Sequence, residues 1–469
     1  MRKHASRQRN NFIYIKQIAN IGVSIIIFKA LQFIAALSIL IFIHELGHFM
    51  WARIFKVKVE KFYLFFDTEK FALLRWKPKG SDTEYGIGWI PLGGYCAISG
   101  MVDETHSADD LGKEIQPWEF RAKGAFPRFM IMFGGVLNNI ILACIIYICM
   151  AWHWGSDVLE LRNLENGMSY SEYAQSIGFR NGDILWSVDD VPAEDGNFHN
   201  ALLLGNKAVV KRDGELVEIA LPDTIGQVFL RDQKQLALFA SPRYPMVVAG
   251  LPSDDSPAAM AGMQVGDSIV GVNGNKAVFG DEVRPYFAEF AGESIQLAFY
   301  RGDSLMTASL VVNADSTIGI ALRPAVSADA FTHIDYTFLE AIPAGIQRGW
   351  DMLYNYVRQF KLVFTKEGAQ SLGGFGTMGS IFPETWSWMI FWSITAFFSV
   401  ALAFMNILPI PGLDGGHILI LLIETIIRRP ISDKAKDIAQ YVGFGIVIAL
   451  MVYVNANDIW KFIIKPWLG

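Results

Sequence analysis

Cysteine is scarce in this sequence, with only Cys96, Cys144 and Cys149 among 469 residues. Three cysteines without zinc-ligand spacing give neither a disulfide framework nor a cysteine-based zinc site. Charged residues make up only 18% of the chain, and the formal net charge is −6. This balance excludes a protein that binds nucleic acid through a strongly basic surface.

Hydrophobic residues, in contrast, make up 52% of the chain and gather in four stretches long enough to cross a bilayer. The stretches cover residues 25–49, 129–152, 388–408 and 438–460. Tryptophans lie near their ends, as an interfacial aromatic belt requires: Trp152, Trp154, Trp386, Trp388 and Trp460. The fourth stretch is the weakest because Asn455, Asn457 and Asp458 break its end. We therefore expect a multi-pass α-helical membrane protein.

The first stretch contains the pattern His44-Glu45-Leu46-Gly47-His48. Two histidines four residues apart lie on one face of a helix, about one turn from each other. Their imidazoles can bind one zinc ion, and the glutamate between them can act as a general base on water. Two histidines that only pack against a neighbouring helix are the alternative. That alternative does not explain an acidic residue where a charge costs about 2.5–3.5 kcal/mol to insert.

The N-terminus is basic, and a basic region before an apolar run resembles a signal peptide. The basic residues are Arg2, Lys3, Arg7, Arg9 and Lys16, with no acidic residue among them. The apolar run is too long for a signal peptide, however, and cleavage after it would remove both histidines. We interpret this region as an uncleaved membrane segment.

A catalytic zinc usually takes three protein ligands and leaves one position open. Asp414 is a candidate for the third ligand, because it follows Pro409 and Pro411 at the end of the third apolar stretch. Each proline breaks the helix, since it lacks an N–H group and clashes with the preceding turn. A broken helix with a carboxylate at membrane depth is a suitable place for a metal ligand. His417 is the competing candidate.

The segment 83–95, between the first two stretches, alternates apolar residues with many glycines. This pattern predicts a hairpin or a short sheet. Non-helical backbone at membrane depth is tolerated only where it is buried in protein or lines a cavity. A sheet beside the histidines would satisfy that rule, and an ordinary cytosolic hairpin is the alternative.

The long region between the second and third stretches contains an internal repeat. Residues 174–190 and 256–274 each contain an alanine, a glycine, and Gly-Asp followed by an alternating strand and a turn. Both copies resemble the PDZ domain in its circularly permuted bacterial form, the second more clearly than the first. PDZ domains bind extended peptide ends by strand addition. For the first copy, a β-rich domain without a peptide ligand remains an alternative.

Two further elements are expected before the third stretch. Residues 341–364 carry apolar side chains at helical spacing, which predicts an amphipathic helix on the membrane surface or against the PDZ-like pair. Residues 373–379 are dense in glycine and predict a flexible loop, either a hinge or a loop close to substrate.

Together, the His-Glu-Leu-Gly-His pattern and the Asn-x-x-Pro-x-Pro-x-Leu-Asp-Gly-Gly pattern that begins at Asn406 resemble the site-2 protease family of intramembrane zinc proteases. The two PDZ-like repeats resemble its bacterial RseP-type branch. The resemblance covers nearly the whole chain from about Lys29 onward. It implies about four transmembrane helices, a membrane-associated β element and two α+β PDZ-like domains between the second and third helices. The expected divisions are 1–128, 129–152, 155–241, 242–325, 326–386 and 387–469.

The resemblance also implies the chemistry of the site. His44, His48 and Asp414 would bind one catalytic zinc ion, and Glu45 would be the base and proton shuttle. The family assigns the third ligand to the aspartate, which favours Asp414 over His417.

A Gly-x-x-x-Asn pattern of the family matches Gly135 to Asn139. The resemblance implies that Asn139 holds the substrate or stabilises the developing oxyanion. Because Gly134 and Asn138 duplicate the pattern, its register stays open.

Substrate contacts are implied at three more residues. Asn406 would contact the substrate backbone, and Gly93 and Gly94 would belong to a β element that pairs with an unwound substrate helix. Substrates would be single-span membrane proteins such as anti-sigma factors, trimmed beforehand by another protease. The PDZ-like domains would bind peptide ends or act as a size filter.

The resemblance places the protein in the bacterial inner membrane, with the PDZ-like domains outside the cytoplasm and the active site towards the cytoplasmic side. The basic N-terminus favours the cytoplasm, and so does the loop 56–128, which carries more Lys and Arg. One span separates the two, so they conflict, and we follow the loop and the resemblance.

Two other functions compete with a protease. A catalytically inactive, membrane-anchored PDZ scaffold would not need intact His44, Glu45, His48 and Asp414. A metal transporter also uses intramembrane His and Asp, but it usually has more spans and would leave the PDZ-like repeat unexplained.

Overall fold

The computed structural model describes residues 2–68, 71–91, 93–101, 114–194, 198–231, 239–324, 326 and 330–465, with side chains from residue 24 onward. The chain divides into two compact units, which are treated separately. Unit 1 comprises Met1–Gly155, Asp335–Lys361 and Leu372–Gly469, and unit 2 comprises Ser156–Ile334 and Leu362–Ser371.

Unit 1 contains four helices that are long and apolar enough to cross a membrane, within the part of the chain that the structure describes. They are α1 (Arg2–Ile54), α2 (Ala125–Trp154), α12 (Trp388–Ile407) and α14 (Asp433–Ile459), and α14 continues into a π-helical turn at Trp460–Ile464. The four predicted stretches are thus confirmed. The last helix begins earlier than its apolar run because Ser432 caps it, accepting a hydrogen bond from the backbone of Ala435.

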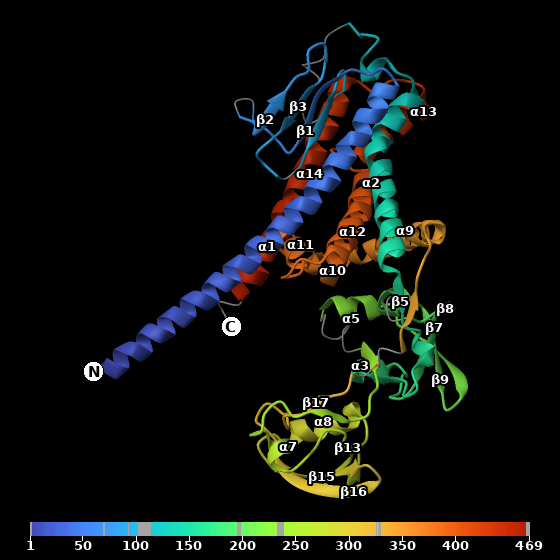
Figure 1. Cartoon of the computed structure of the whole chain (residues 1–469). Coiled ribbons are helices and arrows are strands. Elements are labelled where there is room, and N and C mark those ends of the chain that lie inside the picture. The colour runs from blue at the N-terminus through green and yellow to red at the C-terminus, as the bar shows by residue number, and fades with distance from the viewer. Residues whose placement is uncertain are drawn as a thin grey trace. The chain divides into compact units, whose positions relative to one another are not determined.

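Helix α2 contacts α1, α12 and α9 (Figure 1). Glycines allow the closest approach, since a Cβ at Gly47 would lie 2.2 Å from the carbonyl oxygen of Gly134. On the other side, Ser399 of α12 donates a hydrogen bond of 2.7 Å to the carbonyl of Asn139. Small residues and interhelical hydrogen bonds are what hold helices together where lipid removes the hydrophobic drive.

The third apolar helix ends at Ile407, and a new helix, α13 (Asp414–Ile427), begins after the two prolines. The connection is tight: a Cβ on Gly415 would lie 2.2 Å from the carbonyl oxygen of Leu408, and Gly412 has a φ of +94°. The predicted break is therefore present, and glycine is required at both positions. It places Asp414 on the first turn of α13.

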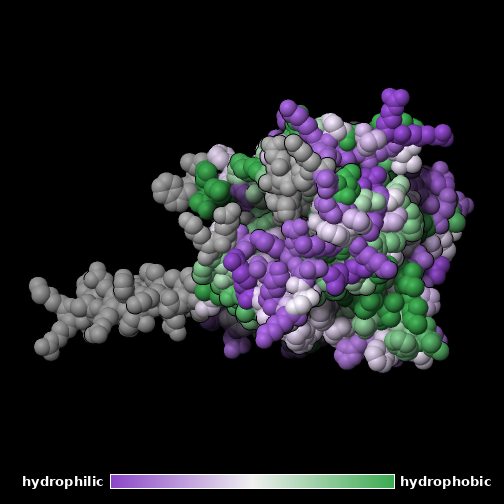
Figure 2. Space-filling view, turned by 90° about the horizontal axis from the view of Figure 1, so that it is seen from above, coloured by the Kyte–Doolittle hydropathy of each residue, from purple (hydrophilic) through white to green (hydrophobic). Residues whose placement is uncertain are grey.

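The segment between α1 and α2 forms a four-stranded sheet at the end of the bundle where α2 begins (Figure 1). Its strands are β1 (Val59–Leu64), β2 (Leu74–Trp76), β3 (Glu84–Ile87) and β4 (Tyr95–Ile98), in the order β2-β3-β1-β4. Strand β1 pairs in parallel with β3 and antiparallel with β4. Segment 83–95 is thus part of a sheet and not a hairpin, and β4 is an edge strand. In Figure 2, hydrophilic residues cover most of the face at this end of the molecule.

Helix α9 (Phe338–Phe360) confirms the predicted amphipathic helix, and its apolar stripe faces outward, as a helix on the membrane surface requires. Trp350 and Tyr354 are 62% and 54% exposed, whereas Gly345 and Gly349 are buried. A Cβ on Gly345 would meet the backbone of Ile148 in α2 at 2.4 Å. The small residues pack on α2 because they permit close approach, and the large apolar side chains remain for an apolar environment.

The glycine-rich segment forms a short helix, α11 (Phe375–Ser380), where a flexible loop was predicted. The polar end of α14 holds it in place. Asp458 accepts hydrogen bonds from the backbone and the hydroxyl of Thr377, and Asn455 accepts one from the backbone of Phe375. The residues that weakened the fourth stretch in the sequence therefore satisfy the free N–H groups at the start of α11.

Unit 2 contains two four-stranded sheets with the same strand order. The first is β10-β9-β7-β8 and the second is β16-β15-β13-β14. The strands are β7 (Ile184–Val188), β8 (Val191–Pro192), β9 (Lys207–Arg212), β10 (Glu215–Ala220), β13 (Ser268–Val272), β14 (Asn275–Lys276), β15 (Ser294–Arg301) and β16 (Ser304–Val311). The internal repeat found in the sequence is therefore a repeat of structure.

Shorter elements complete both units. The helices are α3 (Glu172–Ser176), α4 (Phe198–Leu204), α5 (Ile225–Arg231), α7 (Pro257–Met260), α8 (Gly280–Glu289) and α10 (Lys366–Ser371). The strands are β5 (Ser156–Val158), β6 (Met168–Tyr170), β11 (Ala240–Pro242), β12 (Val248–Gly250), β17 (Ala321–Leu322) and β18 (Thr332–Ile334). The 3-10 turns are η2 (Phe120–Ala122), η3 (Leu161–Asn163) and η5 (Lys361–Phe364).

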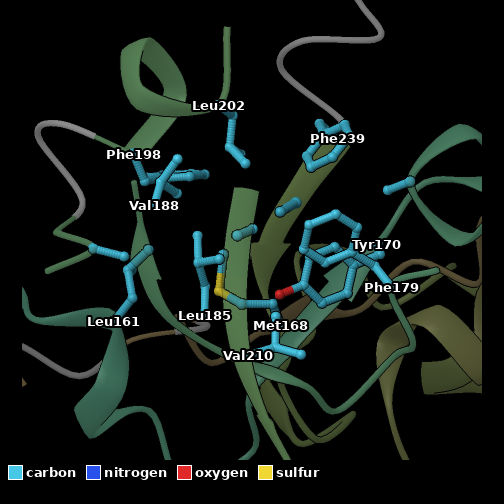
Figure 3. Packing of buried hydrophobic residues seen from close by; sticks show 14 of the residues in the cluster. Leu161, Met168, Tyr170, Phe179, Leu185, Val188, Phe198, Leu202, Val210 and Phe239 are labelled. Carbon is cyan, nitrogen blue, oxygen red and sulfur yellow. The ribbon is translucent and has the colours of Figure 1, made fainter. Parts of the chain in front are cut away.

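Each copy of the repeat has its own apolar core. In the first copy, side chains including Met168, Tyr170, Leu185 and Phe239 pack together (Figure 3). In the second copy, Ile269, Val283 and Phe299 belong to a separate cluster.

The Gly-Asp pair of the repeat has a structural role that the sequence did not reveal. Asp183 and Asp267 are 2% and 0% exposed. Asp183 accepts two hydrogen bonds from Arg212, which also donates to the carbonyl of Gly178. In the second copy, Asp267 accepts two from Arg301, which also donates to the carbonyl of Gly262. Such bidentate pairs fix a loop to a strand in the same way in both copies.

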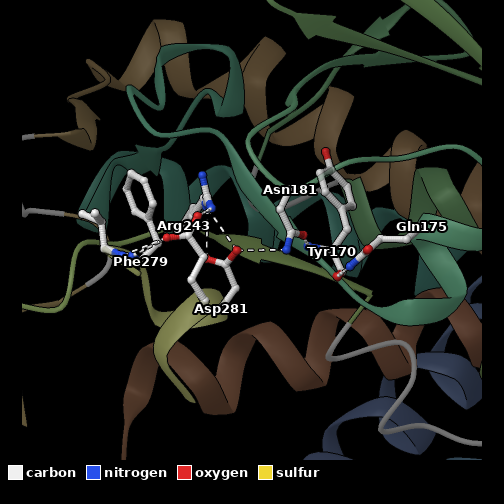
Figure 4. A network of polar contacts seen from close by, with 8 residues as sticks. Tyr170, Gln175, Asn181, Arg243, Phe279 and Asp281 are labelled. Atoms are coloured by element: carbon white, nitrogen blue, oxygen red, sulfur yellow. Dashed lines mark hydrogen bonds and ion pairs between the residues drawn. The ribbon is translucent and has the colours of Figure 1, made fainter. Parts of the chain in front are cut away.

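A second set of polar contacts joins the two copies (Figure 4). Arg243 donates to Asp281 at 2.9 Å and lies over the ring of Phe279 at 3.9 Å. Asn181 of the first copy donates to the same aspartate at 2.9 Å. One carboxylate from the second copy therefore binds groups from both sides of the junction.

Burial and ion pairing shift the pKa of Asp267 in opposite directions. Burial raises the pKa of its carboxyl, but the Arg301 guanidinium and the backbone N–H of Gln264 outweigh burial and hold the pKa below its usual value. A group with a depressed folded-state pKa contributes stability above its unfolded pKa and loses it as pH falls through the folded value.

We expect Asp267→Asn to destabilise the second copy by about 2–3 kcal/mol, because it leaves a partly buried guanidinium without its charge partner. The wild-type chain should also lose hydrogen-exchange protection in β13 and β15 as pH falls below about 4, and the variant should lose this pH dependence. Exposed Asp254→Asn is the control. Equal exchange protection in Asp267→Asn and wild type at pH 7 would contradict the assignment.

Candidate metal centre

The structure brings His44, His48 and Asp414 together. The Nε2 atoms of the two imidazoles are 3.3 Å apart, and Asp414 Oδ2 lies 3.2 Å from His44 Nε2 and 3.4 Å from His48 Nε2. Both histidines are buried, with 8% and 6% exposure. Residues that lie far apart in the sequence thus form one cluster, as the paired motifs predicted.

His48 is oriented by the backbone of α2. Its Nδ1 lies 2.8 Å from the carbonyl oxygen of Ile131. A carbonyl can only accept, so Nδ1 donates and Nε2 keeps its lone pair towards the cluster. This is the outer contact that metal-binding histidines usually make.

His44 is flanked by two asparagines. Asn139 Nδ2 lies 3.3 Å from His44 Nδ1, and Asn406 Nδ2 lies 3.2 Å from His44 Nε2. Asn138 instead donates a hydrogen bond of 3.3 Å to the carbonyl of Ile43. Of these two neighbouring asparagines, Asn139 is the one in contact with His44, which favours the register that ends at Asn139.

Gly135 explains why the histidines can lie so close to α2. A Cβ at this position would lie 2.5 Å from His48 Nε2 and 2.6 Å from a ring carbon of His44. Any other residue would collide with both imidazoles. The sequence pattern named this glycine, but only the structure gives its physical reason.

The donor set fits a zinc ion. Two imidazole nitrogens and one carboxylate oxygen are ligands that catalytic zinc takes, with a fourth position left for water or substrate. Asp414 Oδ2 is buried and has no hydrogen-bond partner within the described structure, although it lies 3.2 Å and 3.4 Å from the two imidazole nitrogens. A buried carboxylate oxygen that faces two nitrogen lone pairs is costly unless a cation lies between them.

A cleft of 470 Å³ opens at this cluster. Glu45, Gly93, Gly94 and Asn406 line it, as the predicted roles require. Strand β4 and the glycines before it form one wall, and α14 forms another with Phe444, Val447, Ile448 and Met451. Asn139 is fully buried and is absent from the described residues that line the cleft.

His417 also lines the cleft, but it is not part of the cluster that the described residues form. It lies one turn further along α13 than Asp414. The first turn of α13 faces the imidazoles, so the geometry supports Asp414 as the third ligand.

The chain is similar to known proteases over most of its length. The family model described as Peptidase family M50 matches residues 32–450. Protease RseP of Yersinia pestis is 27% identical over 92% of this chain and 98% of its own length. Regulator of sigma E protease of Haemophilus influenzae is 25% identical over 91% of this chain and 97% of its own length. A protein of Borreliella burgdorferi, named as an inferred zinc metalloprotease, is 28% identical over 90% of this chain and 95% of its own length.

We expect Gly135→Ala to lower zinc affinity at least about tenfold, because the new methyl group displaces the imidazoles from their shared position. Metal analysis of the purified protein against a competing chelator measures this change. Gly445→Ala is the matched control, since a Cβ on that helical glycine would meet nothing within 4 Å. Equal zinc affinity in both variants would contradict the close packing of α2 on the histidines.

We expect Asp414→Ala to lower zinc affinity at least about a hundredfold, because it removes a direct ligand, whereas outer contacts alone contribute about 10- to 100-fold. His417→Ala removes a neighbouring polar residue of the same helix and should leave the zinc content near that of wild type. The opposite pattern in the two variants would assign the third ligand to His417.

Proposed function

Because the chain belongs to peptidase family M50, we propose that it hydrolyses a peptide bond within or beside the membrane-spanning helix of its substrates. It is a zinc metalloprotease. The observation that carries the intramembrane proposal is the cluster of His44, His48 and Asp414 with Glu45 in a cleft between apolar helices. A peptide bond that enters this cleft meets the complete set of groups needed to cut it.

His44, His48 and Asp414 would hold the zinc ion, which would supply Lewis-acid chemistry and make water a stronger acid. The protein contributes orientation. Ile131 fixes the tautomer of His48 through its carbonyl, and the start of α13 fixes the carboxylate. No large movement is needed to bring the three ligands together.

Glu45 accepts a proton from the attacking water and delivers it to the leaving amine. Gly94 lies beside this glutamate, where a Cβ would clash with Ile41 at 2.6 Å and with the carbonyl of Tyr63 at 2.7 Å and would touch Glu45 Cγ at 3.4 Å. Glycine therefore leaves room for the carboxylate and for a substrate chain beside it.

We assign Asn139 a role that differs from the one that the family resemblance implies, and we keep the implied role of Asn406. Asn139 was expected to stabilise the oxyanion, but it is buried behind His44 and does not line the cleft. We assign it to positioning: its side-chain amide faces His44 Nδ1 at 3.3 Å, and a half-turn of that amide brings its oxygen there, so that Nδ1 donates and Nε2 keeps its lone pair for the metal. Asn406, which lines the cleft, takes the contact with the substrate backbone.

A substrate helix must unwind locally, because its own hydrogen bonds and side chains shield each peptide bond. The freed backbone groups are expensive to leave unpaired in lipid. Strand β3 has neighbours on both sides, so the edge available beside the cleft is β4, with Gly93 and Gly94 leading into it. We assign substrate pairing to this edge, where an added strand would satisfy the freed groups.

The substrates proposed for this chain are single-span membrane proteins of the anti-sigma-factor type, in keeping with the names of two relatives. We assign the two copies of the repeat, 155–241 and 242–325, to PDZ-like domains that bind peptide ends or exclude untrimmed substrates. Prior trimming by another protease, an inner-membrane location and extracytoplasmic PDZ-like domains belong to the same proposal. The loop 56–128, rich in Lys and Arg, supports this orientation.

We expect Glu45→Gln to lower the rate of cleavage by about 10²- to 10⁴-fold, the range that a positioned general base contributes. Zinc content should stay unchanged, because glutamine keeps the shape of the side chain and removes no ligand. The exposed Glu384→Gln is the control. Normal cleavage by the Glu45 variant would remove the base from this mechanism, and zinc-loaded wild type that never cuts would favour a peptide-binding scaffold.

A further inference from the structure

A second pocket, of 620 Å³, lies in unit 1 where α13 ends and α2 and α14 begin. Its lining is basic, with Arg121, Arg128, Arg428, Arg429 and Lys436. Two acidic residues, Glu424 and Asp433, complete its charged lining among the described residues. The pocket therefore carries more positive than negative charge, and the catalytic site does not include it.

Glu424 is only 6% exposed and organises one wall of the pocket. It accepts hydrogen bonds from Arg128 at 3.0 Å and from the backbone of Ile431 at 3.0 Å, and it pairs with Lys436 at 2.9 Å. These contacts join α2, α13 and α14 at one point. The single buried carboxylate is therefore fully used by groups of the protein itself.

Positive charge remains beyond this pairing. Arg428 and Arg429 are exposed, and neither side chain forms an ion pair or a hydrogen bond with the residues that the structure describes. Arg428 has a φ of +52°, so the chain turns sharply as α13 ends. The Nε of Arg128 is buried without a partner in the described structure. The pocket thus offers donors and charge for an anion.

The surroundings identify the kind of anion. Apolar side chains on the last turns of α13 and at the start of α2 and α14 are strongly exposed: Ile426 by 71%, Phe126 by 66% and Ile438 by 57%. Helices α2 and α14 are candidate membrane spans. A ligand that suits both the charge and this apolar rim has an anionic head and hydrocarbon chains.

We propose that this pocket binds the phosphate headgroup of an anionic phospholipid. Basic pockets between membrane helices are established sites for such headgroups. The position of the pocket agrees with this proposal, since the pocket lies at the same end of unit 1 as the Lys- and Arg-rich loop before α2. The lipid would brace the end of α13, whose first residue is Asp414.

The test uses the full-length, zinc-loaded chain in detergent, titrated with phosphatidylglycerol and followed by native mass spectrometry. We expect Arg428→Gln with Arg429→Gln to weaken lipid binding at least about tenfold, because each basic residue beside an anionic headgroup raises the affinity about fivefold. Phosphatidylcholine should bind wild type at least about tenfold more weakly. Lys77→Gln with Lys79→Gln removes the same charge from exposed residues of the β element and should leave binding unchanged.

Equal binding of phosphatidylglycerol by the arginine double variant and wild type would overturn the proposal, and so would an equal loss in the lysine control. Displacement of the lipid by millimolar inorganic phosphate would identify a free-phosphate site, and displacement by an acidic peptide would identify a protein partner. Arg428→Lys with Arg429→Lys keeps the charge and should restore binding to within about threefold. If the glutamine double variant does not fold, the lysine double variant and the comparison of the two lipids on wild type still test whether the pocket binds an anionic lipid.

Discussion

One carboxylate oxygen and two imidazole nitrogens lie within 3.4 Å of one another among apolar helices, and much of unit 1 serves to hold them there. Buried polar atoms of this kind are costly unless a cation or hydrogen bonds compensate. The break between α12 and α13 brings the carboxylate to membrane depth, and the contact of Gly47 with Gly134 brings α1 against α2. Gly135 then leaves space for both imidazoles. The same few glycines and prolines therefore define both the fold and the metal centre.

The cleft combines two kinds of wall, which suits a substrate that arrives as a helix and is cut as a strand. Strand β4 offers an edge of backbone groups, and α14 offers apolar side chains. Of the described residues of α14, only Gly443 and Asp458 are buried, so most of this helix presents its side chains away from the rest of the protein. Its far end is fixed by polar contacts with α11, and its near end shares the buried Glu424 with α2 and α13.

The sequence predicted what depends on composition and local pattern. Length and hydropathy predicted the four candidate membrane helices, and the spacing of His44 and His48 with the broken helix before Asp414 predicted the three residues that the structure brings together. It did not predict strand order, because the pairing of β1 between β3 and β4 is non-local. The burial of Asn139 and the packing of Gly345 on α2 could not be predicted for a related reason: both depend on which face of α2 a neighbour meets. Nor could spacing alone link Asp267 to Arg301 on a distant strand.

We propose that the cleft cuts a peptide bond inside a membrane-spanning segment. The most direct test reconstitutes the zinc-loaded chain in liposomes with a single-span substrate, and maps the cleaved bond by mass spectrometry of both products. The account predicts new termini within the apolar span, and no products once zinc has been removed by a chelator. Cleavage only in the soluble flanks of the substrate, or cleavage that persists without zinc, would contradict it.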